Sequence, residues 1–590
     1  MDIFSVLTMF GGLALFLYGM NALGDGLAKL SGGRLEKILE KLTSSKIKGV
    51  LLGAVVTAAI QSSSATTVMV VGFVNSGIMK LTQAISIIMG ANIGTTATSW
   101  ILSLSGIESD STLIQLLKPS SFSPIFAIIG IIMIMFSKKE RMKDVGNILI
   151  GFAILMFGME TMSAAVKPLA NNASFTSLLT MFTNPVLGVV AGALLTAIIQ
   201  SSSASVGILQ ALCVTGSLNY SMVFPIVLGQ NIGTCVTAMI SSIGASKNAK
   251  RTALVHLYFN LMGVAIFMIG FYSLTSFIDF AFLDDVVSPA DIAILHSTFN
   301  IGATLLLLPF TKGLEKLARL TIRNDKDDEK AKKVDNDFRA LDLRFLDQPS
   351  YAIDQARKVT ISMAYHSKEC LFKAMSLLEN YDEEIAKDVV ELENRVDKYE
   401  DRIGTYLVKI SSRNLSESDS RVLTELLHCI GDFERIADHA VNLLAASKEM
   451  HEKKLVFSEE ANKELKVFSK AIRDIVESTV VVFEEKDMVV ASIIEPMEEV
   501  IDNLSDELKN RHIRRLAENK CTIELGFIFS DITTNFERIS DHCSNVAVCL
   551  IQVDENEYET HEYLDYVKHD NAEFKEKYNL FKEKYILPKM

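Results

Sequence analysis

A block of one glutamine followed by three serines occurs twice in the chain, and each copy ends an apolar stretch. The copies are Gln61-Ser62-Ser63-Ser64, after residues 53–60, and Gln200-Ser201-Ser202-Ser203, after residues 192–199. Lipid offers no hydrogen bonds, so serines that end a membrane-embedded segment must bond to protein or to a ligand. Two equivalent copies therefore indicate one polar site built from two halves.

The serine blocks are part of a longer internal repeat with one constant offset. Gln61 corresponds to Gln200 as Gly19 does to Gly158, and a third pair of segments follows in the same register. These segments are Gly90-Ala91-Asn92-Ile93-Gly94-Thr95 and Gly229-Gln230-Asn231-Ile232-Gly233-Thr234. Glycines beside an asparagine in an apolar span predict that both segments are locally unwound, which would add a second pair of broken elements.

The chain divides near residue 320 into an apolar half and a charged half. Residues 1–310 carry 16 of the 58 Lys and Arg and 13 of the 71 Asp and Glu, so the remainder is strongly acidic. Apolar runs near the roughly 20 residues that cross a bilayer predict membrane spans. They are expected near residues 3–23, 81–104, 121–137, 145–165, 221–244, 252–278 and 290–310. The first lacks a basic leader and a convincing cleavage site, so we interpret it as a span.

The positions of Lys and Arg predict the orientation of these spans, because basic short loops tend to stay in the cytoplasm. The basic clusters are residues 29–48, 138–143, 247–251 and 312–323, and the acidic connections are 108–110 and 284–285. To keep all basic loops inside, residues 49–77 must enter and leave on the cytoplasmic side, and 186–216 on the outer side. Each is then a re-entrant hairpin with its serines at the turn, the repeats are inverted, and the C-terminus is cytoplasmic.

Inverted repeats whose broken helices meet near the bilayer midplane are the architecture of secondary transporters. A helix that restarts after a break presents free N–H groups and a positive dipole end, and serine hydroxyls add donors, so an anion can bind without lysine. The hydroxyl and amide oxygens could also hold a small cation, which makes sodium coupling chemically feasible. The alternative is that Ser, Gly and Thr serve only close helix packing.

The paired blocks and the Asn-Ile-Gly-Thr segments resemble the type II sodium/phosphate cotransporter family over about residues 1–310. The resemblance implies a domain at 1–315 with inverted repeats at about 11–104 and 150–243, and sodium-driven uptake of inorganic phosphate. Carried over by position, the residues for phosphate or sodium are Gln61, Ser62, Ser63, Ser64, Thr66, Asn92, Thr95, Gln200, Ser201, Ser202, Ser203, Asn231 and Thr234. Which residue serves which ion stays open.

Two similar patterns in the membrane half place a histidine and an asparagine one helical turn apart. They are His256 with Asn260, and His296 with Asn300. Ionisable groups inside a membrane are candidates for function. A proton role is possible in principle, but we favour neutral histidines that hydrogen-bond between helices.

A charged linker at 316–344 leads into long amphipathic helical patterns that predict an α-helical bundle. This half also repeats itself, because the segment from Asp432 to His439 corresponds to that from Asn535 to His542. Carboxylates four residues apart lie on one helix face. The pairs are Glu393 with Asp397, Glu434 with Asp438, Asp502 with Asp506, and Glu537 with Asp541.

Residues 345–560 resemble the phosphate-uptake regulator PhoU, and residues 561–590 form a charged C-terminal tail. The resemblance implies two three-helix bundles, a regulatory role in phosphate handling, and iron or zinc held by the acidic pairs, namely Glu393, Asp397, Glu434, Asp438, Asp502, Asp506, Glu537 and Asp541. Carboxylates near His439 and His542 suit a divalent metal. The alternative is a solvated acidic face paired with Arg435 and Arg538.

The sequence therefore predicts an all-α, multi-pass protein of the plasma membrane with a cytoplasmic PhoU-like domain. Its expected function is symport of inorganic phosphate with Na⁺ across the lipid bilayer, without enzymatic chemistry or nucleic acid, and with a homodimer as one possible state. The alternatives are a membrane-anchored phosphate sensor, a carrier of another small oxyanion, and coupling to H⁺. No Walker-type phosphate loop is present, which argues against a primary pump.

Overall fold

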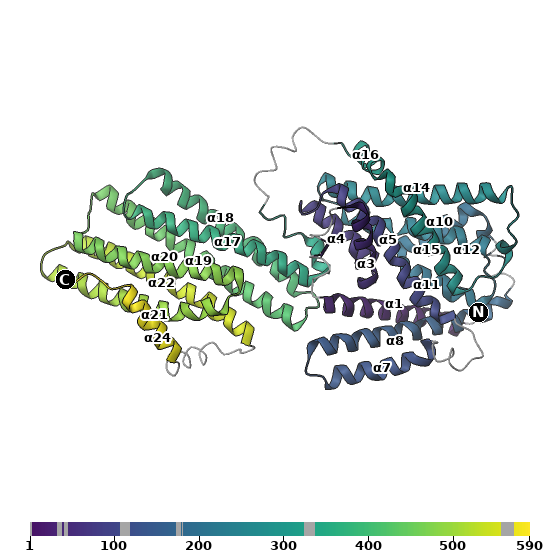
Figure 1. Ribbon diagram of the computed structural model, residues 1–590, viewed down its shortest axis with the longest axis horizontal. Helices are drawn as coiled ribbons and strands as arrows, with labels where there is room; N and C mark the ends of the chain where they lie inside the picture. The colour runs from purple at the N-terminus through teal and green to yellow at the C-terminus, as the bar shows by residue number, and fades with distance from the viewer. Residues whose placement is uncertain are drawn as a thin grey trace. The chain divides into compact units, whose positions relative to one another are not determined.

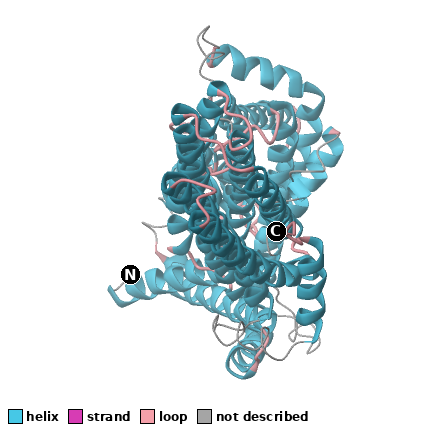
Figure 2. Cartoon of the chain, turned by 90° about the vertical axis from the view of Figure 1, so that its left-hand side faces the viewer, coloured by secondary structure: helices cyan, strands magenta, loops and turns pink. Residues whose placement is uncertain are grey.

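The structure is a computed structural model that describes residues 3–31, 38–39, 45–106, 119–172, 177, 179, 181–323, 337–555 and 572–589. These residues are almost entirely helical, and Figure 2 shows helices and loops but no strand arrows among them. One isolated bridge joins Asn219 to Val286. The all-α fold class predicted from the sequence is confirmed.

The chain forms two compact units, residues 1–351 and 352–590 (Figure 1). The first unit contains the apolar repeats. Its helices are α1 (Ile3–Ser31), α3 (Lys46–Ile60), α4 (Ser63–Asn75), α5 (Leu81–Ser103), α7 (Pro119–Phe136), α8 (Glu140–Val166), α10 (Pro185–Ile199), α11 (Ser202–Leu212), α12 (Tyr220–Gly233), α13 (Cys235–Ser241), α14 (Lys247–Thr275), α15 (Pro289–Leu307) and α16 (Thr311–Thr321).

Six helical segments in the described residues are long and apolar enough to cross a membrane. They are Ile3–Leu30, Leu81–Gly106, Glu140–Leu169, Tyr220–Ser241, Lys247–Thr275 and Pro289–Thr321. The remaining predicted span, 121–137, corresponds to the shorter apolar helix Ser121–Phe136. Both hairpins, α3 with α4 and α10 with α11, are also built from shorter helices of 11 to 15 residues.

The first helices of the two repeats, α1 and α8, run antiparallel and in close contact. Gly12 lies against Met162, whereas Gly26, two helical heptads later, lies against Ile148. The approach depends on glycine, since a Cβ on Gly19 would overlap the backbone of Leu155. Antiparallel packing of equivalent helices is the relation that inverted repeats require.

The predicted unwinding around Asn92 and Asn231 is wrong. Helix α5 is continuous through Asn92, and the break between α12 and α13 is confined to Thr234, whose backbone angles (φ −60°, ψ −26°) remain helical. The glycines serve packing instead: a Cβ on Gly90 would overlap the carbonyl of Val50, and one on Gly229 that of Val189. They let each hairpin's first helix lie directly on the following span.

The second unit is a helical bundle made of two successive sets of three long helices. They are α17 (Pro349–Leu377), α18 (Glu383–Ser411) and α19 (Glu417–Lys453), then α20 (Glu459–Glu485), α21 (Met488–Ala517) and α22 (Ile523–Glu555). Side chains at equivalent positions of α19 and α22 form hydrogen bonds between the two sets. His542 bonds to Asp432 at 2.9 Å, and His439 bonds to Asn535 at 2.8 Å.

Both ends of the predicted linker and part of the predicted tail are ordered in helices. The linker, expected at 316–344, overlaps α16, and residues 324–336 lie outside the described residues. In the tail, α24 (Ala572–Lys584) packs on α21, and the hydroxyl of Tyr585 donates to Asp474 at 2.7 Å. The C-terminal residues are therefore part of the bundle.

Candidate functional site

The tips of the two hairpins share an unusual backbone conformation. Gln61 ends α3 with φ 60° and ψ 21°, and Gln200 ends α10 with φ 58° and ψ 22°. Both lie in the left-handed region, which non-glycine residues seldom occupy and which costs energy. Strain of this kind, repeated at equivalent positions, is typical of functional sites.

After each glutamine a serine starts the next helix. Ser62 is the N-cap of α4 and accepts the N–H of Ala65 at 3.1 Å. Ser201 is the N-cap of α11 and accepts the N–H of Ala204 at 3.2 Å. Each cap satisfies one of the first four N–H groups, while the positive end of the helix dipole points toward the tip. The two tips thus present two helix N-termini whose N–H groups could hold an anion.

The tips meet in one cavity of about 320 Å³. The hydroxyl of Ser64 in the first tip donates to the carbonyl of Gln200 in the second at 3.4 Å. The cavity is lined by Met20, Asn21, Gly24, Asp25, Ala28, Ile60, Gln61, Ser62, Ser63, Ser64, Ala65, Ile199, Gln200, Ser201, Ser202, Ser203, Asp347 and Gln348. All eight residues of the two predicted Gln-Ser-Ser-Ser blocks are therefore brought together.

The charges of this cavity are unexpected for an anion site. Two carboxylates, Asp25 of α1 and Asp347, are among its lining residues, and no Lys, Arg or His is found among the described ones. A small anion would be held by neutral hydroxyl and N–H donors. The two carboxylate groups in the cavity wall could bind a cation beside the anion.

The first tip forms a side-chain hydrogen bond with a neighbouring span, and the equivalent bond is not formed at the second tip. Thr98 of α5 donates to the side-chain oxygen of Gln61 at 2.9 Å, and the amide nitrogen of Gln61 donates to the carbonyl of Ala58. In the second repeat Gln200 is exposed, and the hydroxyl of Thr237, the counterpart of Thr98, is buried without a hydrogen-bond partner among the described residues.

The other predicted site residues lie behind the tips and do not line the cavity. Thr66 is buried, and its hydroxyl accepts a bond from Thr57 at 3.1 Å. Thr95 and Thr234 bond to carbonyls of their own helices. These threonines stabilise the elements that carry the tips.

The two asparagines of the repeated segments have different partners. Asn92 donates to Asn260 of α14 at 2.8 Å and lies 3.3 Å from a ring nitrogen of His256. Asn231 donates to the carbonyl of Val227 in its own helix. His256 thus bonds between helices, whereas both ring nitrogens of His296 lack a partner among the described residues.

Sequence reasoning missed several residues of the site. Asp25 could have been singled out, because an acidic residue inside an apolar span is a functional candidate by default. Thr98 gives no such signal, since its role depends on the fold that brings it to Gln61. Asp347 and Gln348 lie far along the chain from both serine blocks, and nothing local connects them to the site.

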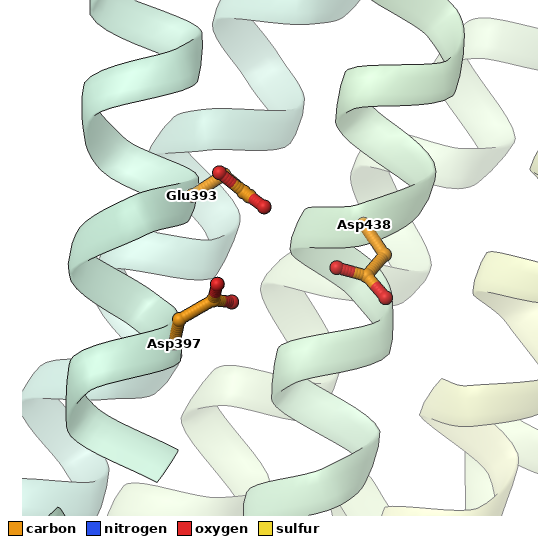
Figure 3. A group of neighbouring side chains, drawn as sticks. All are labelled: Glu393, Asp397 and Asp438. Atoms are coloured by element: carbon orange, nitrogen blue, oxygen red, sulfur yellow. The ribbon is translucent and has the colours of Figure 1, made fainter. Parts of the chain in front are cut away.

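The second unit contains two clusters of carboxylates that could hold a metal ion. The first consists of Glu393 and Asp397 on α18 and Asp438 on α19, with ligand atoms within 4.8 Å of one another. Figure 3 shows the three side chains directed toward the space between the two helices. Hard carboxylate oxygens at this spacing suit a divalent or trivalent cation.

The second cluster differs from its prediction. It consists of Glu498, Asp502 and Asp541, and Asp506 is not part of it. The chain from Asp502 to Asp541 is two residues shorter than that from Asp397 to Asp438, so the register that relates α19 to α22 does not extend to the earlier helix. Glu498 therefore takes the place of Glu393. Its position four residues before Asp502 was a signal available in the sequence.

The remaining predicted ligands bind basic side chains instead of joining a cluster. Glu537 pairs with Lys509 at 2.7 Å, and Glu434 lies 3.9 Å from Arg435. Within the second cluster, Arg538 pairs with Asp541 at 3.1 Å. The alternative of an ion-paired acidic face thus describes part of the second repeat.

Burial and, for the first two, neighbouring charges raise the pKa values of Glu393, Asp397 and Asp541. Burial, followed by the charges of Asp397 and Asp438, raises the pKa of Glu393 above its ordinary value. Burial and then Asp438 raise the pKa of Asp397. Burial also raises the pKa of Asp541, although Arg538 opposes the shift. A bound cation would relieve the repulsion in the first cluster.

Six helices that are long and apolar enough to cross a membrane are typical of a multi-pass membrane protein. The Na+/Pi-cotransporter family matches residues 15–164 and again 154–283, and the PhoU domain matches residues 360–446 and 465–550. The chain belongs to the Na+/Pi-cotransporter family and carries PhoU domains after its membrane unit. Both predicted resemblances are confirmed.

Similar proteins are found in several bacteria. The "Putative inorganic phosphate export protein YjbB" of Escherichia coli K12 is 24% identical over 563 residues, 94% of this chain and 99% of that protein. The uncharacterized protein YqeW of Bacillus subtilis is 31% identical over 330 residues, 54% of this chain and 98% of that protein. The crystal structure of PhoU from Pseudomonas aeruginosa covers 36% of this chain, with a TM-score of 0.33 and 18% identity.

Proposed function

We propose that the protein moves inorganic phosphate together with Na⁺ through the cavity between the two hairpin tips. The observation that carries this proposal is the convergence of two strained glutamines, Gln61 and Gln200, each followed by a serine-capped helix. Backbone N–H groups and serine hydroxyls are suitable donors for a tetrahedral oxyanion. The family to which the chain belongs supports phosphate as that anion.

Sodium coupling is supported by the charges of the cavity. Phosphate carries between one and two negative charges near neutral pH, and the carboxylates of Asp25 and Asp347 line the same cavity. Cations bound beside these groups would lower the repulsion between them and the anion. One or more Na⁺ ions bound with phosphate would neutralise the site and couple the two fluxes.

The direction of flux is set by the sum of the phosphate and sodium gradients. An inward Na⁺ gradient would drive uptake in a symporter, as the sequence predicts. The name of the Escherichia coli relative refers to export, which favours release of phosphate as a second candidate. The same cavity serves either direction, because alternating access is reversible.

The PhoU-like unit is proposed to lie in the cytoplasm and to regulate transport. Glu393, Asp397 and Asp438 would hold an iron or zinc ion there. When bound, the ion would supply positive charge that draws α18 and α19 together. The chain's own part is to keep three carboxylates ionised and close, at the cost of their repulsion.

Reconstitution tests the proposal. Purified protein in liposomes is supplied with radiolabelled phosphate under an imposed Na⁺ gradient, with K⁺ and pH gradients as controls. We expect accumulation that depends on Na⁺ and reverses when the gradient is reversed. Saturable phosphate binding without flux under any gradient would favour a sensor, and equal flux in a pH gradient would replace Na⁺ by H⁺.

A further inference from the structure

The cavity is bounded on one side by a segment that comes from the end of the membrane unit. Residues 341–348, which we call the strap, overlap the end of the predicted linker, lead into α17 and include a short 3-10 helix, Leu343–Asp347. The last two residues of the strap, Asp347 and Gln348, line the cavity together with both hairpin tips. All of these residues belong to the first compact unit.

Polar bonds fix the strap to the membrane unit at two places. Asn75, at the end of α4, donates to Asp342 at 2.7 Å. Arg344 donates from Nε to the carbonyl of Ser241 at 2.8 Å, and it also pairs with Asp342 at 2.6 Å. The strap is thus bonded to the C-terminal ends of α4 and α13.

An aromatic side chain anchors the strap between these bonds. Phe345 is fully buried, with its ring centroid 5.5 Å from that of Phe73 and 5.1 Å from that of Tyr351. It lies over Gly72, where a Cβ would be 2.7 Å from the ring. A side chain larger than hydrogen at position 72 would push the anchor outward.

The features that receive the strap are present in the first repeat and missing from the second. In the register that pairs Gln61 with Gln200, Gly72 corresponds to Ala211 and Asn75 to Val214. The second hairpin therefore has neither the space for an aromatic ring nor the amide that bonds to Asp342. These departures from the repeat are explained if the first hairpin has a docking groove of its own.

We propose that the strap is a built-in gate of the transport cavity. While docked, it closes one side of the cavity and places the side chain of Asp347 in its wall. Displacement of the strap opens the cavity. Because the strap continues directly into α17, it is also the covalent connection through which the PhoU-like unit could control access. The effect on phosphate rests on the proposed function; the docking itself does not.

The gate is tested by the accessibility of a cysteine in the cavity wall. Ala28→Cys provides the reporter, and its rate of modification by a small charged maleimide is measured in the full chain. The parent protein without this cysteine corrects for labelling of the native cysteines. In this background Gly72→Ala removes the room for Phe345 without harming a helix, and Asp342→Ala with Arg344→Ala removes the polar bonds.

Matched controls separate undocking from general loosening. Gly313→Ala is a helical glycine with nothing within 4 Å of the added Cβ, and Leu343→Ala alters a strap side chain that is 55% exposed. We expect the two undocking variants to label about tenfold faster, the size of effect given by losing one charge-assisted hydrogen bond, and the controls to match the parent. Equal rates in all variants would overturn the gate.

Phosphate transport is then measured on the same variants. The undocked forms should transport phosphate faster than the parent protein. Faster labelling without transport in any variant would preserve the gate and refute the proposed function. Faster labelling with slower transport would show that the docked strap assists transport, and would overturn its role as a barrier.

Discussion

The two hairpin tips have nearly the same backbone but different surroundings. Gln61 has φ 60° and ψ 21°, and Gln200 has φ 58° and ψ 22°. Gln61 is nevertheless bonded to Thr98, whereas Gln200 is exposed and Thr237 has no partner among the described residues. The repeated local sequence therefore accounts for the shared conformation of the tips, and tertiary contacts account for the difference in their hydrogen bonds. If the protein is a carrier with alternating access, such a difference would record which half is engaged.

The largest expected effect follows from the left-handed backbone conformation that both tips share. Gln61→Val and Gln200→Val each place a β-branched residue in the left-handed region, where its Cβ substituents clash with the backbone. We expect either change to reduce phosphate flux in liposomes by at least about a hundredfold, because a positive-φ conformation of such a residue is a strained outlier. Gln61→Gly and Gln200→Gly, which permit the backbone, serve as controls and should retain more flux. Equal loss in the glycine and valine variants would show that the amides matter and the conformation does not.

The next effect concerns what distinguishes the tips. Thr98→Val removes the bond to Gln61, and we expect about a tenfold slower flux, as for loss of one well-formed buried hydrogen bond. If the tips exchange roles during transport, Thr237→Val should slow flux equally, although Thr237 makes no such bond in this structure. Initial rates in liposomes decide between the two cases. A normal rate for Thr237→Val would mean that the asymmetry is permanent.

The acidic clusters extend the comparison to the second unit. The pKa values of Glu393 and Asp397 are raised in the folded protein. The folded protein therefore binds protons at these two groups more tightly than the unfolded chain does. The stabilisation that this proton binding gives is fully present at a pH below the ordinary carboxylate pKa of about 4. It is lost as the pH rises through the raised pKa values of the folded protein. With chelator present, calorimetry should show the helical unit melting at lower temperature as pH increases.

Substitution distinguishes the two clusters. Asp397→Asn should flatten this pH dependence and raise the melting temperature at neutral pH, because it removes uncompensated repulsion. Asp541→Asn should do so less, since Arg538 already offsets the charge of Asp541. Iron or zinc added to the wild-type protein should raise its melting temperature, as either substitution does. Identical behaviour of both variants would contradict the proposed difference between the clusters.

The smallest effect lies behind the tips. Thr57→Val removes the donor to Thr66, whereas Thr196→Val, at the equivalent position, replaces a buried hydroxyl that has no partner among the described residues. Loss of the Thr57 hydroxyl should lower the free energy of unfolding by about 1 kcal/mol, whereas loss of the Thr196 hydroxyl should leave it unchanged or raise it. Thermal unfolding in detergent measures both. A larger cost for Thr196→Val would reveal a ligand of its hydroxyl.

Much of this architecture could be predicted from the sequence because it depends on local patterns. The apolar runs, the internal repeats and the breaks at Gln61 and Gln200 are visible in the order of residues. Unwinding at Asn92 was wrong because Gly90 and Gly94 serve contact with α3, which only the tertiary structure shows. The strap and the tie from Thr98 could not be foreseen, since both depend on contacts between distant segments.

The central claim is that phosphate binds between the two tips with Na⁺. Calorimetric titration of the purified full chain with phosphate, in Na⁺ and in K⁺, tests it most directly when Ser64→Ala combined with Ser203→Ala is compared with the wild type. Saturable binding that requires Na⁺ and is lost in the double variant is the predicted result. Undiminished phosphate binding by a folded double variant would contradict it and place the site elsewhere.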